Sequence, residues 1–262
     1  MNITFEKWHG NGNDFAIINS IENKIKLNKS FIKKTSNRNK GIGFDQLIHI
    51  GLPSKHDHDF FIRFYNSDGS EAGMCLNGVR CAARYIWNNN LFPIRQVKIQ
   101  TKRKNLICSP KDKNNVSVLV DSPEEMQVPA LEHKKIKKVM NDDFFLSYIG
   151  NNHLCVQKKS IDKVNLEDLY EKLESILKKY ECNLSIFKKN KGLIQIRTYE
   201  NGTGETLSCG SAALCVAAKF LEGHKNLIKI SSISGKLEFR IHEDAILMSG
   251  PADFIYKGNI NE

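Results

Sequence analysis

The 262-residue sequence predicts an α/β (α+β) protein of two related halves, each a mixed, mostly antiparallel sheet around a central apolar helix. An internal repeat predicts the two halves: Ile62–Ala83 and Ile196–Ala217 are identical at seven of 22 aligned positions. Short β-leaning runs separated by polar turns flank both copies and predict the sheets.

Each copy of the repeat has the same local pattern. A β-leaning run, 60–65 in the first copy and 193–199 in the second, ends in a polar, glycine-containing loop. A cysteine, Cys75 or Cys209, then opens a segment with helical spacing that is apolar on most faces. Such a helix is expected to be enclosed by its own sheet.

The remaining elements follow from shorter patterns. A surface helix is predicted over 166–179, with Asn165 as its N-cap. The boundary between the halves is expected near 117–123. Further short strands are predicted at 97–101, 116–120, 227–231 and 237–241.

Composition narrows the class of protein. With 40% hydrophobic and 26% charged residues, the chain resembles an ordinary soluble protein, and no apolar run approaches the roughly 18–20 residues of a membrane span. The N-terminal MNITFEKWHGNGNDF lacks the apolar core of a secretory signal. We therefore expect a cytoplasmic protein with no membrane partner.

The formal net charge of +10 raises the question of nucleic-acid binding. Lysines outnumber arginines 31 to 8 and are scattered along the chain, whereas bidentate phosphate and base recognition favours arginine. The pattern favours a solvated basic surface and predicts no nucleic-acid partner. Such a surface would still concentrate an anionic small substrate.

The seven cysteines form no CxxC pair, so the sequence predicts neither a metal site nor a disulfide framework. Five are expected to be core residues. Cys75 and Cys209 differ, because each follows a polar loop and precedes small or polar residues. The five expected core cysteines are Cys81, Cys108, Cys155, Cys182 and Cys215.

A thiol at the start of a helix lies beside unpaired backbone N–H groups and the positive end of the helix dipole, which favour its thiolate. The same N–H groups can bind a carboxylate. If two such sites face each other, a thiolate can remove the α-proton of a bound amino acid while a thiol protonates the opposite face. Cys75 and Cys209 are therefore predicted to be an acid/base pair.

Six motifs span nearly the whole chain: HGNGNDF (9–15), GIGFDQ (41–46), FYNSDGSEAGMCLNGVRC (64–81), GNNH (150–153), YENGTGETLSCGS (199–211) and SGPADFIYKG (249–258). In this order they resemble the diaminopimelate epimerase family. The resemblance implies two pseudo-symmetric halves with an active-site cleft between them. It assigns 1–118 with a C-terminal return 252–262 to the N-terminal half, and 119–251 to the C-terminal half. It also implies a homodimer.

The implied enzyme is an isomerase that needs no cofactor and no pyridoxal phosphate. It converts LL-2,6-diaminopimelate to the meso form in lysine and peptidoglycan-precursor biosynthesis. By resemblance, Cys75 and Cys209 are the catalytic pair, and His153 and Glu200 support them. The residues implied to bind substrate are Asn13, Gln46, Asn66, Leu76, Asn77, Asn151, Asn183, Asn201, Gly210 and Ser211.

Three positions depart from the family pattern. Leu76 stands where the family has glycine, which puts bulk at the expected carboxylate cradle, and Asn152 replaces a proline. Asn201 replaces an arginine that pairs with the distal carboxylate, a loss worth about 1.5–3 kcal/mol of binding. Two alternatives therefore stay open: a related racemase with another amino-acid substrate, and a non-catalytic binding protein on the same scaffold.

Overall fold

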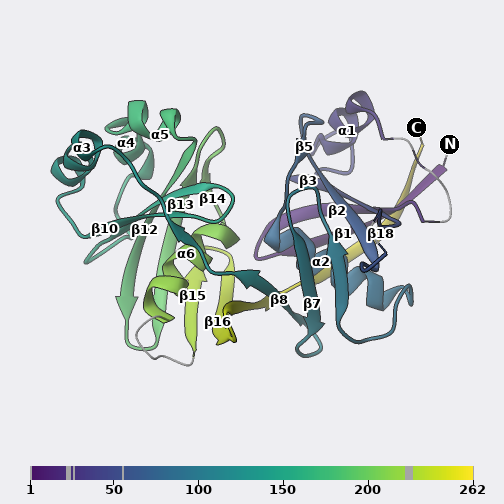
Figure 1. The fold of residues 1–262 in the computed structure, drawn as a ribbon. Coiled ribbons are helices and arrows are strands. Elements are labelled where there is room, and N and C mark those ends of the chain that lie inside the picture. The colour runs from purple at the N-terminus through teal and green to yellow at the C-terminus, as the bar shows by residue number, and fades with distance from the viewer. Residues whose placement is uncertain (1, 22–24, 26, 55, 222–226, 262) are drawn as a thin grey trace. The chain divides into compact units, whose positions relative to one another are not determined.

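The computed structural model describes residues 2–21, 25, 27–54, 56–221 and 227–261. The chain divides into two compact units (Figure 1). Unit 1 comprises Met1–Val120 with Ser249–Glu262, and unit 2 comprises Asp121–Met248. No helix among the described residues is long and apolar enough to cross a membrane.

Unit 1 is a mixed sheet whose neighbouring strands follow the order β18-β1-β2-β3-β4-β6-β7-β8. The β2–β3 and β4–β6 pairs are parallel, the other pairs are antiparallel, and the short β5 pairs with β4. The elements are β1 (Asn2–Gly10), β2 (Asn13–Asn19), α1 (Lys29–Ser36), β3 (Gln46–Gly51), β4 (Phe60–Asn66), β5 (Glu71–Ala72), α2 (Leu76–Asn88), β6 (Val97–Gln100), β7 (Asn105–Pro110), β8 (Asn115–Asp121) and β18 (Asp253–Asn261).

Unit 2 repeats this topology, with neighbouring strands in the order β9-β10-β11-β12-β13-β15-β16. The parallel pairs are now β11–β12 and β13–β15. The elements are β9 (Glu124–Glu125), α3 (Ala130–Met140), β10 (Phe144–Tyr148), β11 (Asn152–Gln157), α4 (Leu166–Glu171), α5 (Glu174–Lys179), β12 (Cys182–Asn190), β13 (Leu193–Glu200), β14 (Gly204–Thr206), α6 (Gly210–Leu221), β15 (Ile228–Ser232), β16 (Gly235–His242) and β17 (Ala245–Pro251). The predicted fold class of mixed, mostly antiparallel sheets around one helix is confirmed.

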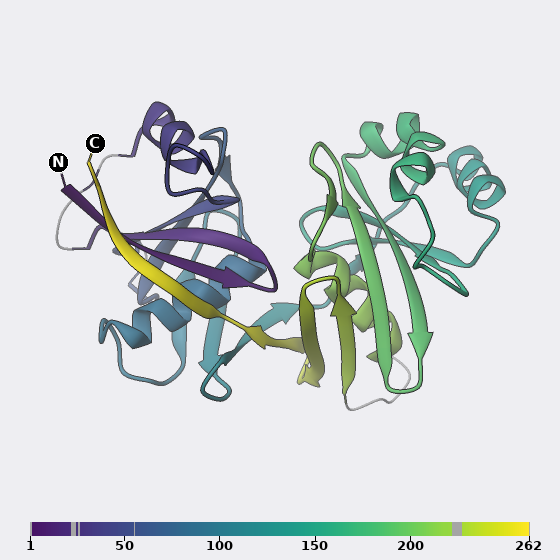
Figure 2. The same cartoon turned by 180° about the vertical axis from the view of Figure 1, so that it is seen from behind.

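The helices α2 and α6 form the centres of their units. Each lies against strands of its own unit, as both views show (Figures 1 and 2). Most residues of both helices are buried, as the apolar pattern predicts. The C-terminal strand β18, yellow in Figure 2, pairs with the N-terminal strand β1 along nearly its whole length.

None of the seven cysteines, all of them among the described residues, forms a disulfide, and the five predicted core cysteines are buried. Burial raises the pKa of Cys182 and of Cys215 to about 12, so both remain thiols at physiological pH. These cysteines therefore act as apolar core residues.

The prediction of one helix over 166–179 is wrong in one respect. Asn165 caps the helix as predicted, accepting hydrogen bonds from the N–H groups of Glu167 and Asp168. The helix stops after Glu171, however, and α5 restarts at Glu174. Both short helices still direct their apolar residues into one core cluster, at the i, i+3, i+4, i+7 spacing that predicted a single helix.

Gly78 marks the closest approach between α2 and its sheet. A methyl group there would lie 2.7 Å from Cε1 of Phe64 and 3.2 Å from Phe15 and Ile48. We expect Gly78→Ala to lower the free energy of unfolding by about 1–3 kcal/mol, despite the better helix propensity of alanine. Denaturant titration measures the change. Gly51→Ala is the control, because its methyl group would have no neighbour closer than 3.9 Å, and equal effects would contradict this account of the packing.

Candidate active site

The predicted site residues divide between the two units. Six lie in unit 1, at the starts of β2 and β3, the end of β4 and the start of α2: Asn13, Gln46, Asn66, Cys75, Leu76 and Asn77. Eight lie in unit 2, around β11, β12, the end of β13 and the start of α6: Asn151, His153, Asn183, Glu200, Asn201, Cys209, Gly210 and Ser211.

Cys75 is the N-cap of α2. The sequence placed it at the first helical position, but its backbone is extended (φ −142°, ψ 112°) and its sulfur accepts the N–H of Gly78 at 3.4 Å. A cap side chain satisfies one of the orphan donors of a helix and leaves others for a ligand. Leu76 follows it, and its side chain is buried, so packing takes up the bulk that the sequence placed at the carboxylate cradle.

Asn13 lies beside the Cys75 sulfur. The Cys75 thiol donates to Oδ1 of Asn13 at 3.5 Å, and Nδ2 of Asn13 donates to Oδ2 of Asp45 at 2.9 Å. The second hydrogen bond decides which end of the amide faces the thiol. Asp45 thus holds Asn13 in the orientation that stabilises the protonated form of Cys75.

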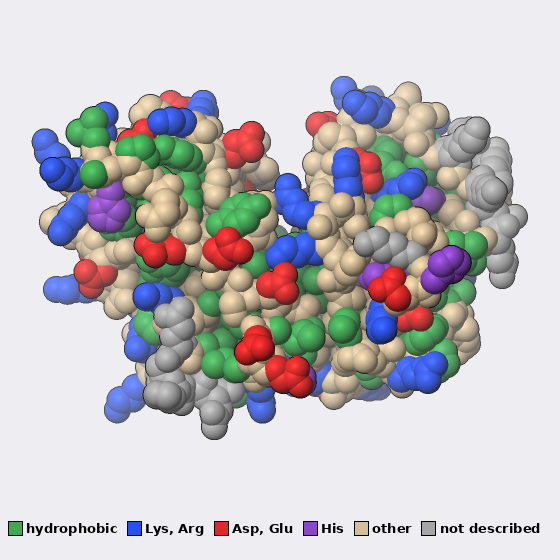
Figure 3. All heavy atoms as spheres, viewed as in Figure 1, with side chains coloured by type: hydrophobic (Ala, Val, Ile, Leu, Met, Phe, Trp, Pro, Cys, Tyr) green, Lys and Arg blue, Asp and Glu red, His purple; other side chains and the backbone are tan. Residues whose placement is uncertain are grey.

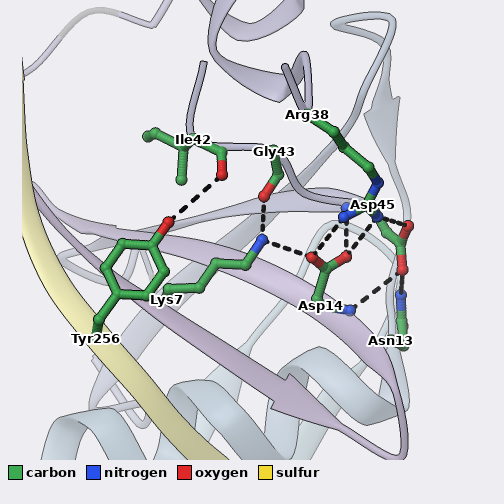
Figure 4. A network of polar contacts seen from close by, with 8 residues as sticks. All are labelled: Lys7, Asn13, Asp14, Arg38, Ile42, Gly43, Asp45 and Tyr256. Atoms are coloured by element: carbon green, nitrogen blue, oxygen red, sulfur yellow. Dashed lines mark hydrogen bonds and ion pairs between the residues drawn. The ribbon is translucent and has the colours of Figure 1, made fainter. Parts of the chain in front are cut away.

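A network of charges holds Asp45 in place (Figure 4). Arg38 makes a bidentate contact with Asp14, at 2.9 and 3.0 Å, and also donates to Asp45 at 2.8 Å. Lys7 donates to Asp14 at 2.5 Å and to the carbonyl of Gly43. Burial opposes ionisation of Asp14, but hydrogen bonds from Arg38 and Lys7 outweigh it and hold the pKa of that carboxyl well below its usual range. The network joins the HGNGNDF and GIGFDQ motifs.

Gln46 and Asn66 are directly opposite each other on β3 and β4. Nε2 of Gln46 donates to Oδ1 of Asn66 at 2.9 Å, and Nδ2 of Asn66 donates to Oγ of Ser70 at 3.0 Å. The two amides are therefore hydrogen-bonded to each other and, through Asn66, to the loop that leads to Cys75.

Arg80 is fully buried one turn into α2. Its guanidinium donates to Oδ1 of Asn77 at 2.9 Å, and to the carbonyls of Leu76 and Pro251 at 3.4 and 3.3 Å. No carboxylate among the described residues forms an ion pair with it. A buried charge without a counterion favours an anion nearby, and here it lies beneath a helix start that already favours one.

Cys209 has the equivalent place in unit 2. Its carbonyl accepts the N–H of Ala213, as that of Cys75 accepts the N–H of Val79, so both cysteines immediately precede their helices. The Cys209 sulfur lies 3.3 Å from Oγ of Ser211, which accepts a hydrogen bond from Nδ2 of Asn151 at 3.3 Å. The predicted residues Asn151, Cys209 and Ser211 thus form one connected group.

The surroundings of Cys209 favour its protonated thiol, although a helix start by itself favours a thiolate. Burial raises its pKa well above the usual value, and the neighbouring Glu200 carboxylate raises it further. Hydrogen bonds from Ser211 and from the N–H of Ala212 act in the opposite direction but do not prevail. The hydroxyl of Thr206 holds Glu200 in place at 2.6 Å.

His153 lies on β11 next to Asn183 on β12. It is fully buried, and neither ring nitrogen has a hydrogen-bond partner among the described residues. Burial lowers its pKa to about 3, so the imidazole is neutral. Buried polar groups in proteins are nearly always hydrogen-bonded, so this ring fits a position that a ligand completes.

The two units differ at equivalent positions of three neighbouring strands. In unit 1, Gln46 pairs with Phe15 on one side and Asn66 on the other. In unit 2, Asn183 pairs with His153. Glu200 occupies the position that corresponds to Asn66 in the internal repeat. Only unit 2 therefore has ionisable side chains here, in addition to its cysteine.

Two hydrogen bonds fix Asn201, one through its backbone and one through its side chain. Its backbone N–H donates to Oδ1 of Asn183 at 2.9 Å, and the hydroxyl of Tyr170 donates to its Oδ1 at 2.6 Å. Tyr170, like Asp45 and Arg80, was not identified from the sequence. Asp45 lies within a recognised motif, whereas Tyr170 is 31 residues away from Asn201 and carries no local signal.

Comparison with known proteins decides the family. The family model for diaminopimelate epimerase matches residues 5–134 and 145–255. The chain belongs to this family. The resemblance carried by the sequence motifs is confirmed, and the chain is an isomerase of the epimerase type.

A diaminopimelate epimerase from Blochmanniella floridana is 34% identical over 277 residues, covering 98% of this chain and 99% of the relative. Solved structures share the fold. A putative phenazine biosynthesis PhzC/PhzF protein from Clostridium difficile superposes with a TM-score of 0.74 at 14% identity, covering 99% of this chain and 100% of that one. A hydroxyproline epimerase from Agrobacterium vitis gives 0.68 at 11% identity, covering 99% and 91%. The epimerase family and these proteins thus share one two-unit architecture.

His153 should make stability depend on acidity. Its pKa is about 3 in the folded chain and about 6.5 when unfolded, so below pH 6.5 protons bind the unfolded chain preferentially and stability falls. Between pH 7 and 5 this amounts to about 2 kcal/mol. Denaturant titrations at both values should show this loss in the native protein but not in His153→Gln. The exposed His133→Gln is the control, and an unchanged pH dependence in His153→Gln would contradict the prediction.

Asp45 should control the reactivity of Cys75. In Asp45→Asn the new amide no longer fixes the orientation of Asn13, so the Cys75 thiol loses its acceptor and the thiolate is favoured. We expect Cys75 to react with iodoacetamide about threefold to tenfold faster at fixed pH, the equivalent of one hydrogen bond. Mass spectrometry of the labelled peptide measures the rate. Asp112→Asn, in an exposed turn, is the control, and a slower reaction in Asp45→Asn would refute the assigned orientation.

Proposed function

We propose that the chain catalyses cofactor-independent epimerisation of LL-2,6-diaminopimelate to meso-diaminopimelate, in lysine and peptidoglycan-precursor biosynthesis. One observation carries the proposal: each unit places a cysteine that forms no disulfide immediately before a buried helix, at matched positions of the internal repeat. Membership of the diaminopimelate epimerase family supports the choice of substrate.

The proposed reaction transfers one proton in each half-step. The thiolate of one cysteine removes the α-proton, the C–H bond breaks, and its electron pair is delocalised into the substrate carboxylate. The thiol of the other cysteine then gives its proton to the opposite face of the carbon. We assign Cys75 as the base for the LL isomer and Cys209 as the acid, because burial and Glu200 keep Cys209 protonated.

The chain's own residues stabilise the intermediate. Backbone N–H groups of the first turns of α2 and α6, at Leu76, Asn77, Gly210 and Ser211, would bind the carboxylate as its negative charge grows. In unit 1 the uncompensated Arg80 adds positive charge beneath this position. In unit 2 His153 and Glu200 would orient the reacting groups and exchange protons with Cys209.

The amide side chains would recognise the rest of the substrate. In unit 1, Asn13 contacts Cys75 and Asp45, while Gln46 and Asn66 are hydrogen-bonded to each other. In unit 2, Asn151, Asn183 and Asn201 lie near the cysteine and the strand ends. A racemase acting on another amino acid is the second candidate. The uncharged Asn201 favours it, since it lacks the charge-assisted contact that the family has at this position.

We further propose a cytoplasmic homodimer without nucleic-acid or membrane partners. Three consecutive large apolar residues of β18, Phe254, Ile255 and Tyr256, are 50%, 48% and 42% exposed, which suits a contact with a second copy. The lysines and arginines on the face in Figure 3 are dispersed among acidic and polar groups, which argues against a phosphate-binding surface.

Turnover in heavy water tests the function. Starting from the LL isomer, the meso product should carry solvent deuterium at the inverted carbon, because the second cysteine delivers a solvent-derived proton. Cys75→Ala and Cys209→Ala should each lower kcat by about 100-fold to 10,000-fold, the usual contribution of a general acid or base. Mass spectrometry and chiral chromatography measure both outcomes.

Cys108→Ala is the matched control for these variants, since Cys108 is a buried cysteine on β7 that precedes no helix. It should retain activity per folded molecule. Absence of exchange and of inversion with the native protein would refute the proposed reaction. Faster turnover of another amino acid, by orders of magnitude, would favour the second candidate.

A further inference from the structure

Two side-chain amides lie at the end of strand β13, those of Asn183 on β12 and of Asn201 just after β13, and the oxygen of each accepts a hydrogen bond. Oδ1 of Asn183 accepts the backbone N–H of Asn201 at 2.9 Å, and Oδ1 of Asn201 accepts the hydroxyl of Tyr170 at 2.6 Å. Neither Nδ2 group donates a hydrogen bond to any residue in the described part of the chain. Each oxygen thus already accepts one hydrogen bond, while the Nδ2 donors of both amides stay available.

This arrangement selects the chemistry of a ligand. A side-chain amide has one acceptor oxygen and two N–H donors, so an amide whose oxygen is engaged offers mainly donors. An ionised carboxylate is acceptor-only and fits such a surface, whereas an ammonium group is donor-only and does not. The geometry favours a carboxylate at the end of β13.

The basic side chains of this region are engaged elsewhere. Arg197, on the same strand, makes a bidentate contact with Glu205 at 2.7 and 2.8 Å and also donates to two backbone carbonyls. Lys178, whose charge acts on Tyr170, forms an ion pair with Glu174 at 2.6 Å. Neither takes the place of the arginine that Asn201 replaces.

We propose that Tyr170 is a positioning residue for substrate specificity: its hydroxyl fixes the Asn201 amide so that Asn201 and Asn183 present their Nδ2 donors as an uncharged subsite for the distal carboxylate. The inference rests on the proposed function, because it concerns the second carboxylate of a dicarboxylic amino acid. It adds a residue of α4 to the site and explains how the site operates without a guanidinium.

The position of Tyr170 suits this role. The residue is buried on α4, and its ring stacks on Tyr199, with centroids 4.4 Å apart and an interplanar angle of 27°. Its pKa is raised, chiefly by burial, so the hydroxyl stays protonated and can donate. A hydroxyl held by a stacked ring orients Asn201 before substrate arrives, which lowers the entropy cost of binding.

Steady-state kinetics with LL-diaminopimelate test the proposal. Tyr170→Phe removes only the hydroxyl and should raise KM about threefold to tenfold, the worth of one hydrogen bond, with kcat within twofold. KM should change alone because the distal carboxylate is bound equally in the ground and transition states. Tyr199→Phe is the matched control, since its hydroxyl has no hydrogen bond among the described residues, and it should leave both constants unchanged.

A second pair of variants separates positioning from packing. Asn201→Arg should lower KM and make the Tyr170→Phe substitution less harmful, because a guanidinium needs no donor from Tyr170 to face a carboxylate. Asn201→Asp should raise KM more than tenfold, because it opposes a carboxylate with another. These comparisons remain informative if Tyr170→Phe alone is too unstable to measure.

The outcomes distinguish this inference from the proposed function. If the native protein does not turn over diaminopimelate, the proposed function fails. If it does, but Tyr170→Phe leaves KM unchanged, matches Tyr199→Phe, or lowers kcat instead, Tyr170 does not position the distal carboxylate. A native KM in the Asn201→Asp variant would likewise contradict the proposed binding of the distal carboxylate by Asn201 and Asn183.

Discussion

Each unit depends on one buried central helix, α2 or α6. The first turn of that helix is left available to a ligand. The apolar faces of α2 and α6 hold each sheet together, so these helices cannot move without loss of the core. The start of such a helix has backbone donors that the protein does not satisfy. Cys75 and Cys209 lie at these helix starts, so each thiol is beside rigid backbone donors that can bind an anion. The same buried helices therefore stabilise the fold and position the proposed site.

The repeat preserved this scaffold while the surroundings of the cysteines diverged. Unit 1 surrounds Cys75 with neutral amides and a buried arginine, whereas unit 2 surrounds Cys209 with a carboxylate and a neutral imidazole. These environments differ in charge: Glu200 disfavours a negative charge on Cys209, whereas Arg80 favours an anion near the start of α2, where Asn13 accepts the Cys75 thiol. Two copies of one motif thereby acquired unlike surroundings for their two thiols.

Asp45 and Tyr170 orient the amide side chains of the proposed site through hydrogen bonds. Asp45 turns the oxygen of Asn13 toward the Cys75 thiol. The hydroxyl of Tyr170 engages the oxygen of Asn201 and leaves its nitrogen available. An amide presents a donor or an acceptor according to which end is held, so these supporting contacts carry as much of the specificity as the amides themselves.

The sequence by itself determined the fold class, the duplicated strand-loop-helix unit, the family, and the position of Cys75 and Cys209 at the starts of the two repeated helices. These follow from periodicity and motifs, which can be recognised from residues that are close together in the sequence. Tertiary structure alone decided that helix 166–179 breaks in two and that burial outweighs the helix dipole at Cys209. It also decided that Tyr170 reaches Asn201. Burial and long-range contacts depend on residues far apart in the chain, so no local pattern contains them.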